Sequence, residues 1–384
     1  MSVFKIPAHV CEGSTALDEA EIYIKSLGSK ALIVTGPHVG KSPMMHRLEM
    51  KLADIGTAYA VFDRVGGEPT DVMVEQGLAV YRAQGCDFVI GLGGGSPIDT
   101  AKAVAAMAVL DGGIADYAGC EINGTGIPGI AAIPTTSGTG SEATGFTVIT
   151  NTETGIKMVL HGDSLVPAVS ILDSSNTVDM PKSVTAMTGL DALTHAIESF
   201  TSKKATALTE PFAISAVKRI MQYLPAAYHS GFDEEAREQM SLAAYEAGVS
   251  INNASVTLVH GMSRPIGVHF HVPHGLSNAM LLADCLDFVK DGATERFALL
   301  GRQTGAAGAG ASDEAAAAAF IKSVKELTAC CEIPTPAEYG IDKDAYYAVM
   351  DLMAEEAMKS GSPGFTRKTV TKEDCIELYK KIYG

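Results

Sequence analysis

The pattern of apolar residues changes near Lys182, and this change constrains the fold more than any other feature of the chain. Before it, short apolar runs alternate with amphipathic segments such as residues 71–83, which predicts strands separated by helices and therefore a parallel sheet. After it, β-branched runs nearly vanish and helical periodicity takes over. The predicted strands are residues 30–35, 87–92, 130–133 and 169–172, and the predicted later helices include 187–200, 210–223, 234–249 and 315–327.

The length agrees with this division, because 384 residues exceed the usual size of a single core. We predict an α/β domain with a parallel sheet at residues 1–181 and an all-α domain at residues 182–384. The Gly/Ala tract at residues 305–311 is predicted as a loop that leads into a helix capped by Ser312. No long linker and no internal repeat is found.

The charge balance limits the partners of the chain. It carries 29 basic and 45 acidic side chains, a formal net charge of −16, without a cluster of lysines or arginines. Nucleic acids and anionic membrane surfaces are therefore not expected as general partners.

The compartment is expected to be the cytoplasm. The first residues lack a charged segment followed by an apolar signal core, and no apolar run is long enough to span a membrane. The seven cysteines are odd in number, scattered and without a Cys-x-x-Cys pair, which favours reduced thiols over disulfides or a thiolate zinc site.

Four side chains in the second half could bind one metal ion. Asp191 and His195 are four residues apart in a segment rich in helix formers, so both would project from one helical face, and His260 and His274 would complete the set. Three imidazoles and one carboxylate suit iron, zinc or a neighbouring transition metal better than calcium or magnesium. The alternative for the Asp-x-x-x-His pair is a helix charge beside a surface or core histidine.

Two glycine-rich turns in the first half could contact phosphates. Gly93-Gly-Gly-Ser96 stands between a predicted strand and a helix, where free N–H groups and the positive end of the helix dipole would face an anion. Residues 134–144 add hydroxyl and backbone donors on a loop after another strand. Neither turn is the usual Gly-x-Gly-x-x-Gly fingerprint, and a surface loop rich in turn formers remains an alternative for the second.

Together these motifs resemble those of the iron-dependent (group III) alcohol dehydrogenases, in particular the lactaldehyde reductase and 1,3-propanediol dehydrogenase branch. The shared segments occur in the family's order and spacing over nearly the whole chain: residues 93–102, 134–142, 189–198, 260–262 and 273–275. The resemblance implies a dinucleotide-binding α/β domain, a helical domain and a catalytic cleft between them. It also implies NAD(H) or NADP(H) as cofactor, Fe²⁺ with Zn²⁺ or another divalent metal as alternatives, and a homo-oligomer.

The resemblance assigns roles to individual residues. The metal ligands would be Asp191, His195, His260 and His274; the cofactor contacts would be Gly94, Gly95, Ser96 and Asp99 in the pyrophosphate loop, Thr135, Thr136 and Thr139 in the second loop, and Lys157 near a ribose. The implied reaction passes hydride between the nicotinamide and a short primary alcohol or aldehyde, with the metal as a Lewis acid.

Arg264 is the first departure from the family pattern, which commonly has histidine at this position after His-Gly. An arginine stays protonated and cannot easily act as a base. His269 or His271 could transfer the proton instead; the alternative is that these histidines lie on the surface or only support a metal ligand. Arg264 would hold an anionic end of the substrate, or else form a structural salt bridge within the helical domain.

Two further departures concern the cofactor. Gly36 follows the strand at residues 31–35, where members that prefer NAD usually place an aspartate nearby, so we predict that NADP(H) is tolerated or preferred, with His38 or Lys41 near the phosphate. Glu68 stands where members often have asparagine before proline, and the sequence does not show its effect.

Two other functions are considered. A dehydroquinate-synthase-like cyclase shares the superfamily, but its densely basic site fits these motifs less well. A binding or structural protein that kept the fold is the second alternative, and retention of all four candidate ligands argues against it.

Overall fold

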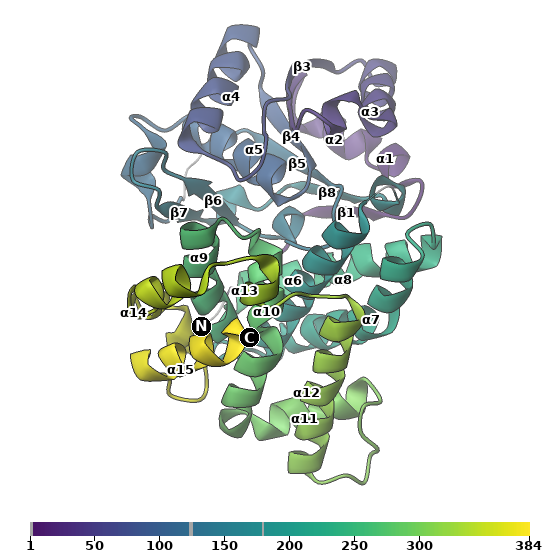
Figure 1. The fold of residues 1–384 in the computed structure, drawn as a ribbon. Coiled ribbons are helices and arrows are strands. Elements are labelled where there is room, and N and C mark those ends of the chain that lie inside the picture. The colour runs from purple at the N-terminus through teal and green to yellow at the C-terminus, as the bar shows by residue number, and fades with distance from the viewer. Residues whose placement is uncertain (1–2, 123–125, 179) are drawn as a thin grey trace. The chain divides into compact units, whose positions relative to one another are not determined.

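The computed structural model describes residues 3–122, 126–178 and 180–384. Two compact units divide the chain, Met1–Met180 and Pro181–Gly384. The first unit contains the strands and the second is helical (Figure 1). This agrees with the predicted fold class, an α/β domain followed by an all-α domain.

A six-stranded sheet forms the centre of the first unit, with the strand order β1-β8-β5-β4-β2-β3 and parallel pairing throughout. The predicted strands correspond to β2 (Lys30–Thr35), β4 (Phe88–Gly93), β5 (Gly129–Pro134) and β8 (Val169–Leu172). Four strands were not predicted: β1 (His9–Glu12), β3 (Ala58–Phe62) and the antiparallel pair of β6 (Phe146–Thr150) and β7 (Lys157–His161).

Helices cover both faces of this sheet. Along β2, Ala31 and Ile33 pack into one core, whereas Leu32 and Val34 pack into another, as the period of two in a strand requires. The first core includes side chains from α1 (Ala16–Glu19), α2 (Glu21–Leu27) and α3 (Pro43–Asp54); the second includes side chains from α4 (Asp71–Gln84) and α5 (Gly95–Met107). Burial on both faces explains why the central strands are continuous apolar runs.

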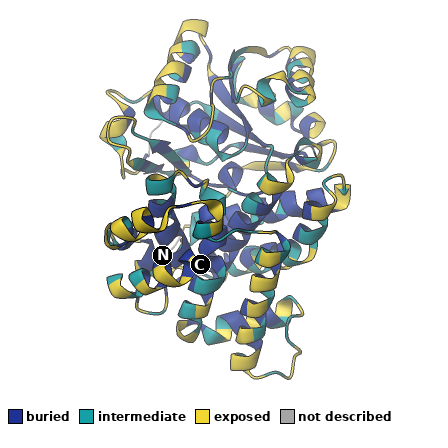
Figure 2. Cartoon of the chain, viewed as in Figure 1, coloured by how far each residue is buried: buried dark blue, intermediate teal, exposed yellow. Residues whose placement is uncertain are grey.

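The second unit packs its helices around one large apolar core, and the buried residues of these helices face inward (Figure 2). The helices are α6 (Lys182–Thr201), α7 (Glu210–His229), α8 (Glu234–Asn253), α9 (Leu258–Phe270), α10 (His274–Val289), α11 (Thr294–Gln303), α12 (Asp313–Cys330), α13 (Pro336–Tyr339), α14 (Lys343–Lys359) and α15 (Lys372–Tyr383). The predicted cap of α12 is confirmed, because the Ser312 side chain accepts a hydrogen bond from the Ala315 N–H. Among the described residues, none of the helices has the length and hydropathy needed to cross a membrane.

Candidate metal centre and nucleotide loops

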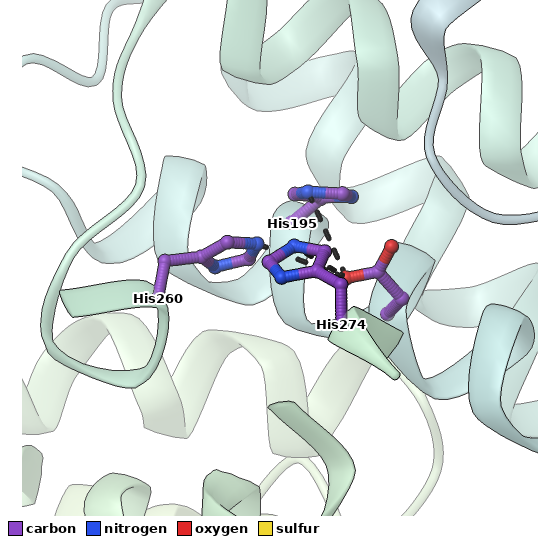
Figure 3. A group of neighbouring side chains, drawn as sticks. His195, His260 and His274 are labelled. Carbon is purple, nitrogen blue, oxygen red and sulfur yellow. Dashed lines mark ion pairs between the residues drawn. The ribbon is translucent and has the colours of Figure 1, made fainter. Parts of the chain in front are cut away.

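The four predicted metal ligands come together in the helical unit. Asp191 and His195 lie one turn apart on α6, His260 is on α9, and His274 is the first residue of α10. The Nε2 atoms of His195, His260 and His274 lie 3.9, 3.7 and 3.8 Å from Asp191 Oδ1 (Figure 3). One ligand atom from each residue falls within 4.8 Å of all the others, so one ion could contact the four side chains together.

The protonation of the cluster suits a cation. Burial, together with the neighbouring His195 and His274, holds the pKa of His260 well below its ordinary value, so this imidazole is neutral and its Nε2 is free to bind. Burial acts to raise the pKa of Asp191, but the three imidazoles and a hydrogen bond from Asn278 lower it below its usual range. One carboxylate with three imidazoles is a donor set that fits iron or zinc.

Glu198 orients His260 and was not identified from the sequence. Its Oε2 lies 2.6 Å from His260 Nδ1, which places the proton on Nδ1 and leaves Nε2 toward the cluster. Its Oε1 accepts hydrogen bonds from Thr257 Oγ1 and the Val259 N–H, at 2.8 and 2.6 Å, where α9 begins. Glu198 therefore orients the imidazole of His260 and also caps the first turn of α9, the helix that carries His260.

Asn278 was also missed. Its Nδ2 donates to Asp191 Oδ1 at 2.7 Å and lies 3.1 Å from His260 Nε2 and 3.2 Å from His274 Nε2. Its Oδ1 is buried and has no hydrogen-bond partner among the described residues. Because four residues separate it from His274 on α10, helical geometry directs both side chains to the same centre.

The two predicted cofactor loops meet in the first unit. Gly94 is the N-cap of α5, so the backbone N–H groups of Gly95 and Ser96 belong to the first turn of a thirteen-residue helix. A Cβ added at Gly95 would lie 2.7 Å from Thr139 Cγ2, too close for any side chain, and one at Gly94 would lie 3.3 Å from Thr136 Cγ2. The Thr135 N–H donates to the Gly93 carbonyl at 2.9 Å.

A pocket of about 390 Å³ opens beside the first of these loops. Its lining includes the predicted Gly36, Gly94 and Ser96, and no described Asp or Glu contributes to it. The complete lining is Gly36, Pro37, His38, Val39, Val65, Gly66, Gly67, Gly93, Gly94, Ser96 and Pro97. Such a pocket at the carboxyl ends of parallel strands is a usual place for a nucleotide.

Asp99, predicted to contact the cofactor, forms hydrogen bonds to protein through both carboxylate oxygens. Oδ1 accepts from Ser141 Oγ at 2.6 Å and Oδ2 from the Val148 N–H at 2.8 Å. Nearby on α5, the buried Lys102 Nζ donates to the carbonyls of Thr144 and Phe146 at 2.7 and 2.9 Å. These two residues hold the segment after that loop, residues 141–148, to α5, and no role for Lys102 had been identified from the sequence.

Lys157 forms an ion pair with Glu68, with Nζ and Oε1 2.7 Å apart. Glu68 directly follows Gly67, which lines the pocket, so the pair lies next to the pocket in the chain. Glu68, which departs from the family pattern, therefore pairs with the charge of Lys157, the lysine expected near a ribose.

The three residues predicted for proton transfer or substrate contact have different surroundings. His269 Nε2 is 2.9 Å from Glu356 Oε2 on α14, and His271 is exposed at the C-cap of α9 with a φ of 54°. Arg264 is partly buried on α9, and its Nη1 donates to Ser362 Oγ at 3.3 Å.

Comparison with known proteins covers nearly the whole chain. Residues 7–174 match the family model of iron-containing alcohol dehydrogenases, and residues 185–383 match the C-terminal model of the same family. An NAD-dependent methanol dehydrogenase of Bacillus methanolicus is 34% identical over 382 residues, which are 99% of each chain.

Solved structures agree with this match. A 1,3-propanediol oxidoreductase has a TM-score of 0.96 at 33% identity, with all of both chains covered. A sulfoacetaldehyde reductase from Bifidobacterium kashiwanohense has a TM-score of 0.86 at 26% identity, covering 100% of this chain and 99% of the other. The cyclase alternative is therefore not favoured, and the chain belongs to the iron-containing alcohol dehydrogenase family.

Proposed function

We propose that this chain reduces short aldehydes to primary alcohols, and catalyses the reverse oxidation, with a divalent metal and a nicotinamide cofactor. The convergence of Asp191, His195, His260 and His274 within 4.8 Å carries the proposal. When bound, an ion such as Fe²⁺ or Zn²⁺ supplies Lewis acidity toward a carbonyl or hydroxyl oxygen. A bound nicotinamide would give hydride to, or take it from, the carbon that bears this oxygen, and one proton would move in the same direction.

The protein's own groups bind and orient the reactants. The first turn of α5, with Gly94, Gly95 and Ser96, would bind the diphosphate of the cofactor through backbone N–H groups. The second loop, with Thr135, Thr136 and Thr139, would lie over the same nucleotide. Lys157 would contact a ribose either while it keeps its ion pair with Glu68 or after that ion pair breaks.

The pocket at Gly36 supports use of NADP(H) as well as NAD(H). Among the residues that the structure describes, no carboxylate lines the pocket that could repel a 2′-phosphate, and His38 is part of its wall. The B. methanolicus relative is named as NAD-dependent, so both cofactors belong in the first assay.

Two candidates for the proton carrier remain, and they differ in surroundings. His269 is bonded to Glu356, whereas His271 is exposed. Each histidine is replaced by glutamine and the pH profile of kcat is measured. The proton carrier is the histidine whose replacement removes one ionisation from this profile.

The decisive experiment is metal reconstitution. Protein stripped by a chelator is reloaded anaerobically with Fe²⁺ or Zn²⁺, and NADH and NADPH oxidation is followed with short neutral aldehydes. We expect no turnover of the stripped protein, restored turnover after loading, and no restoration in Asp191→Ala. Turnover that is independent of metal, or no turnover with any metal, cofactor and aldehyde, would contradict the proposal.

Assembly and location are part of the same proposal. The family resemblance favours a homo-oligomer, which light scattering of the purified protein tests. All seven cysteines are free thiols, which supports a reducing compartment such as the cytoplasm.

A further inference from the structure

Arg264 is placed next to the metal cluster by the geometry of α9. It follows His260 by four residues, so the two side chains project from nearly the same helical face, about 6 Å or slightly more than one turn apart along the axis. Its guanidinium also contacts Ser362, in the short segment η7 (Ser362–Phe365), through a hydrogen bond to the hydroxyl. The guanidinium is thus held between the metal-facing side of α9 and this segment.

The guanidinium has no carboxylate partner in the described parts of the chain. No aspartate or glutamate oxygen lies within the 4.0 Å of an ion pair, and its hydrogen bond to Ser362 Oγ is long at 3.3 Å. Glu198 is the acidic group whose charge acts on it, but both oxygens of Glu198 are already bonded to His260, Thr257 and Val259. A structural salt bridge was the alternative role for Arg264 in the sequence analysis, and no described residue forms one with it.

Such an unpaired cation is costly unless an anion joins it. Burial lowers the pKa of the Arg264 guanidinium, but an arginine keeps its proton at ordinary pH, so the charge persists. A partly desolvated charge without a partner destabilises its surroundings, whereas a bound carboxylate or sulfonate supplies two parallel charge-assisted hydrogen bonds.

We propose that Arg264 binds the anionic end of the substrate, and that the preferred substrates are short aldehydes with a terminal carboxylate, sulfonate or phosphonate. This inference rests on the proposed function, because the aldehyde oxygen is taken to lie at the metal cluster. The separation of one helical turn between Arg264 and His260 sets the length of the substrate at roughly two to four carbons. The Ser362 hydroxyl, already turned toward Arg264, can donate to the same anion.

The first test compares aldehydes of matched length. Kinetics are measured with 3-oxopropanoate, sulfoacetaldehyde and phosphonoacetaldehyde, and with neutral propanal and 3-hydroxypropanal. We expect the wild-type protein to have a kcat/KM on an anionic aldehyde about 10- to 100-fold above that on the neutral ones. The best of the three anions identifies the terminal group.

Variants assign this preference to Arg264. Arg264→Gln should lower the ratio of kcat/KM for anionic against neutral aldehydes by about 10- to 100-fold. Arg264→Lys should retain part of the preference for anionic aldehydes, because lysine keeps the charge but lacks the two parallel donors of the guanidinium. Lys322→Gln is the matched control, since Lys322 is an exposed cation of the same unit and its removal changes the net charge equally. It should leave the ratio unchanged.

Binding without turnover gives an independent readout. Calorimetric titration with 2-hydroxyethanesulfonate should show saturable binding to the wild-type protein and a loss of about 10-fold or more in affinity in Arg264→Gln. Equal losses on neutral and anionic aldehydes, an unchanged affinity for the sulfonate, or a raised KM for NAD(P)H alone would overturn the proposal. Failure of every aldehyde, neutral ones included, would instead count against the proposed dehydrogenase function.

Discussion

Single residues around the metal cluster show what the sequence can and cannot reveal. Asp191, His195, His260 and His274 were predictable because their side-chain types can bind metal and two of them share a helical spacing. Glu198 and Asn278 were not, although Glu198 ends the segment that contains Asp191 and His195 and Asn278 is four residues after His274, because carboxylates and amides are common on helices. Their roles depend on contacts with residues 62 and 87 positions away in the chain.

Replacement of Glu198 tests its positioning role. Glu198→Gln removes the charge that holds the proton on His260 Nδ1, so we expect metal affinity to fall about 10- to 100-fold, measured by competition with a chromogenic chelator. Glu355→Gln, a control at a half-exposed position of the same unit, should have no effect. Unchanged metal affinity in Glu198→Gln would show that Glu198 serves only to cap α9.

Glu142 makes the stability of the first unit depend on pH. Burial raises the pKa of this carboxyl from 4.5 to about 7, with Lys102 acting against the shift and Asp99 near the same lysine. A raised pKa means that the folded state favours the protonated form, so this contribution is complete below pH 4.5 and is lost as the pH rises through 7.

The variant Glu142→Gln should therefore match the wild type at pH 5 and exceed it at pH 8. We expect a difference in the free energy of unfolding of about 1–3 kcal/mol at pH 8, measured by urea denaturation of the metal-free protein. The exposed Glu153→Gln is the control for loss of one negative charge. A Glu142→Gln curve parallel to that of the wild type over this range would refute the assignment.

At the scale of elements, burial decided which strands could be predicted. The inner strands β2, β4, β5 and β8 are almost wholly buried and read as apolar runs. The edge strands β1 and β3 have mostly exposed or half-buried side chains, so their sequences lack that signal. The hairpin of β6 and β7 alternates between buried and half-buried residues, a weak pattern over five residues each.

The turn after β2 should control the choice of cofactor. A side chain at Gly36 is excluded, because a Cβ there would lie 2.9 Å from the Val65 carbonyl oxygen, so an aspartate cannot simply be restored at this position. His38 lines the same pocket and is not buried. We expect His38→Asp to lower kcat/KM for NADPH about 10-fold or more while NADH is much less affected, because the carboxylate would repel the 2′-phosphate.

Steady-state kinetics with both cofactors at one ionic strength measure this effect. His38→Asn has nearly the same shape without the charge and separates repulsion from simple loss of the imidazole. Equal losses for NADPH and NADH in His38→Asp would place the 2′-phosphate elsewhere.

The whole molecule separates its two kinds of chemistry between its two units. All four candidate metal ligands belong to Pro181–Gly384, whereas the glycine loops and the pocket belong to Met1–Met180. The sequence predicted this separation because strand periodicity ends where the ligand-bearing helices begin. It could not predict the contacts that Asp99 and Lys102 make with residues 141–148, because these depend on how that segment packs against α5.

This separation predicts two distinct protection patterns in hydrogen exchange. A metal ion bound by residues of α6, α9 and α10 links three helices. Because binding stabilises the closed state of these helices, hydrogen exchange of their amides should slow by about 100-fold when the metal concentration is 100 times its Kd. NADPH should slow exchange in residues 93–107 and 135–147 instead, whether or not metal is present. In Asp191→Ala the metal effect should vanish while the NADPH effect persists. If metal protected residues 93–107 as strongly as α6, or if NADPH failed to protect Asp191→Ala, the two sites would not bind independently and the roles assigned to the two units would have to be revised.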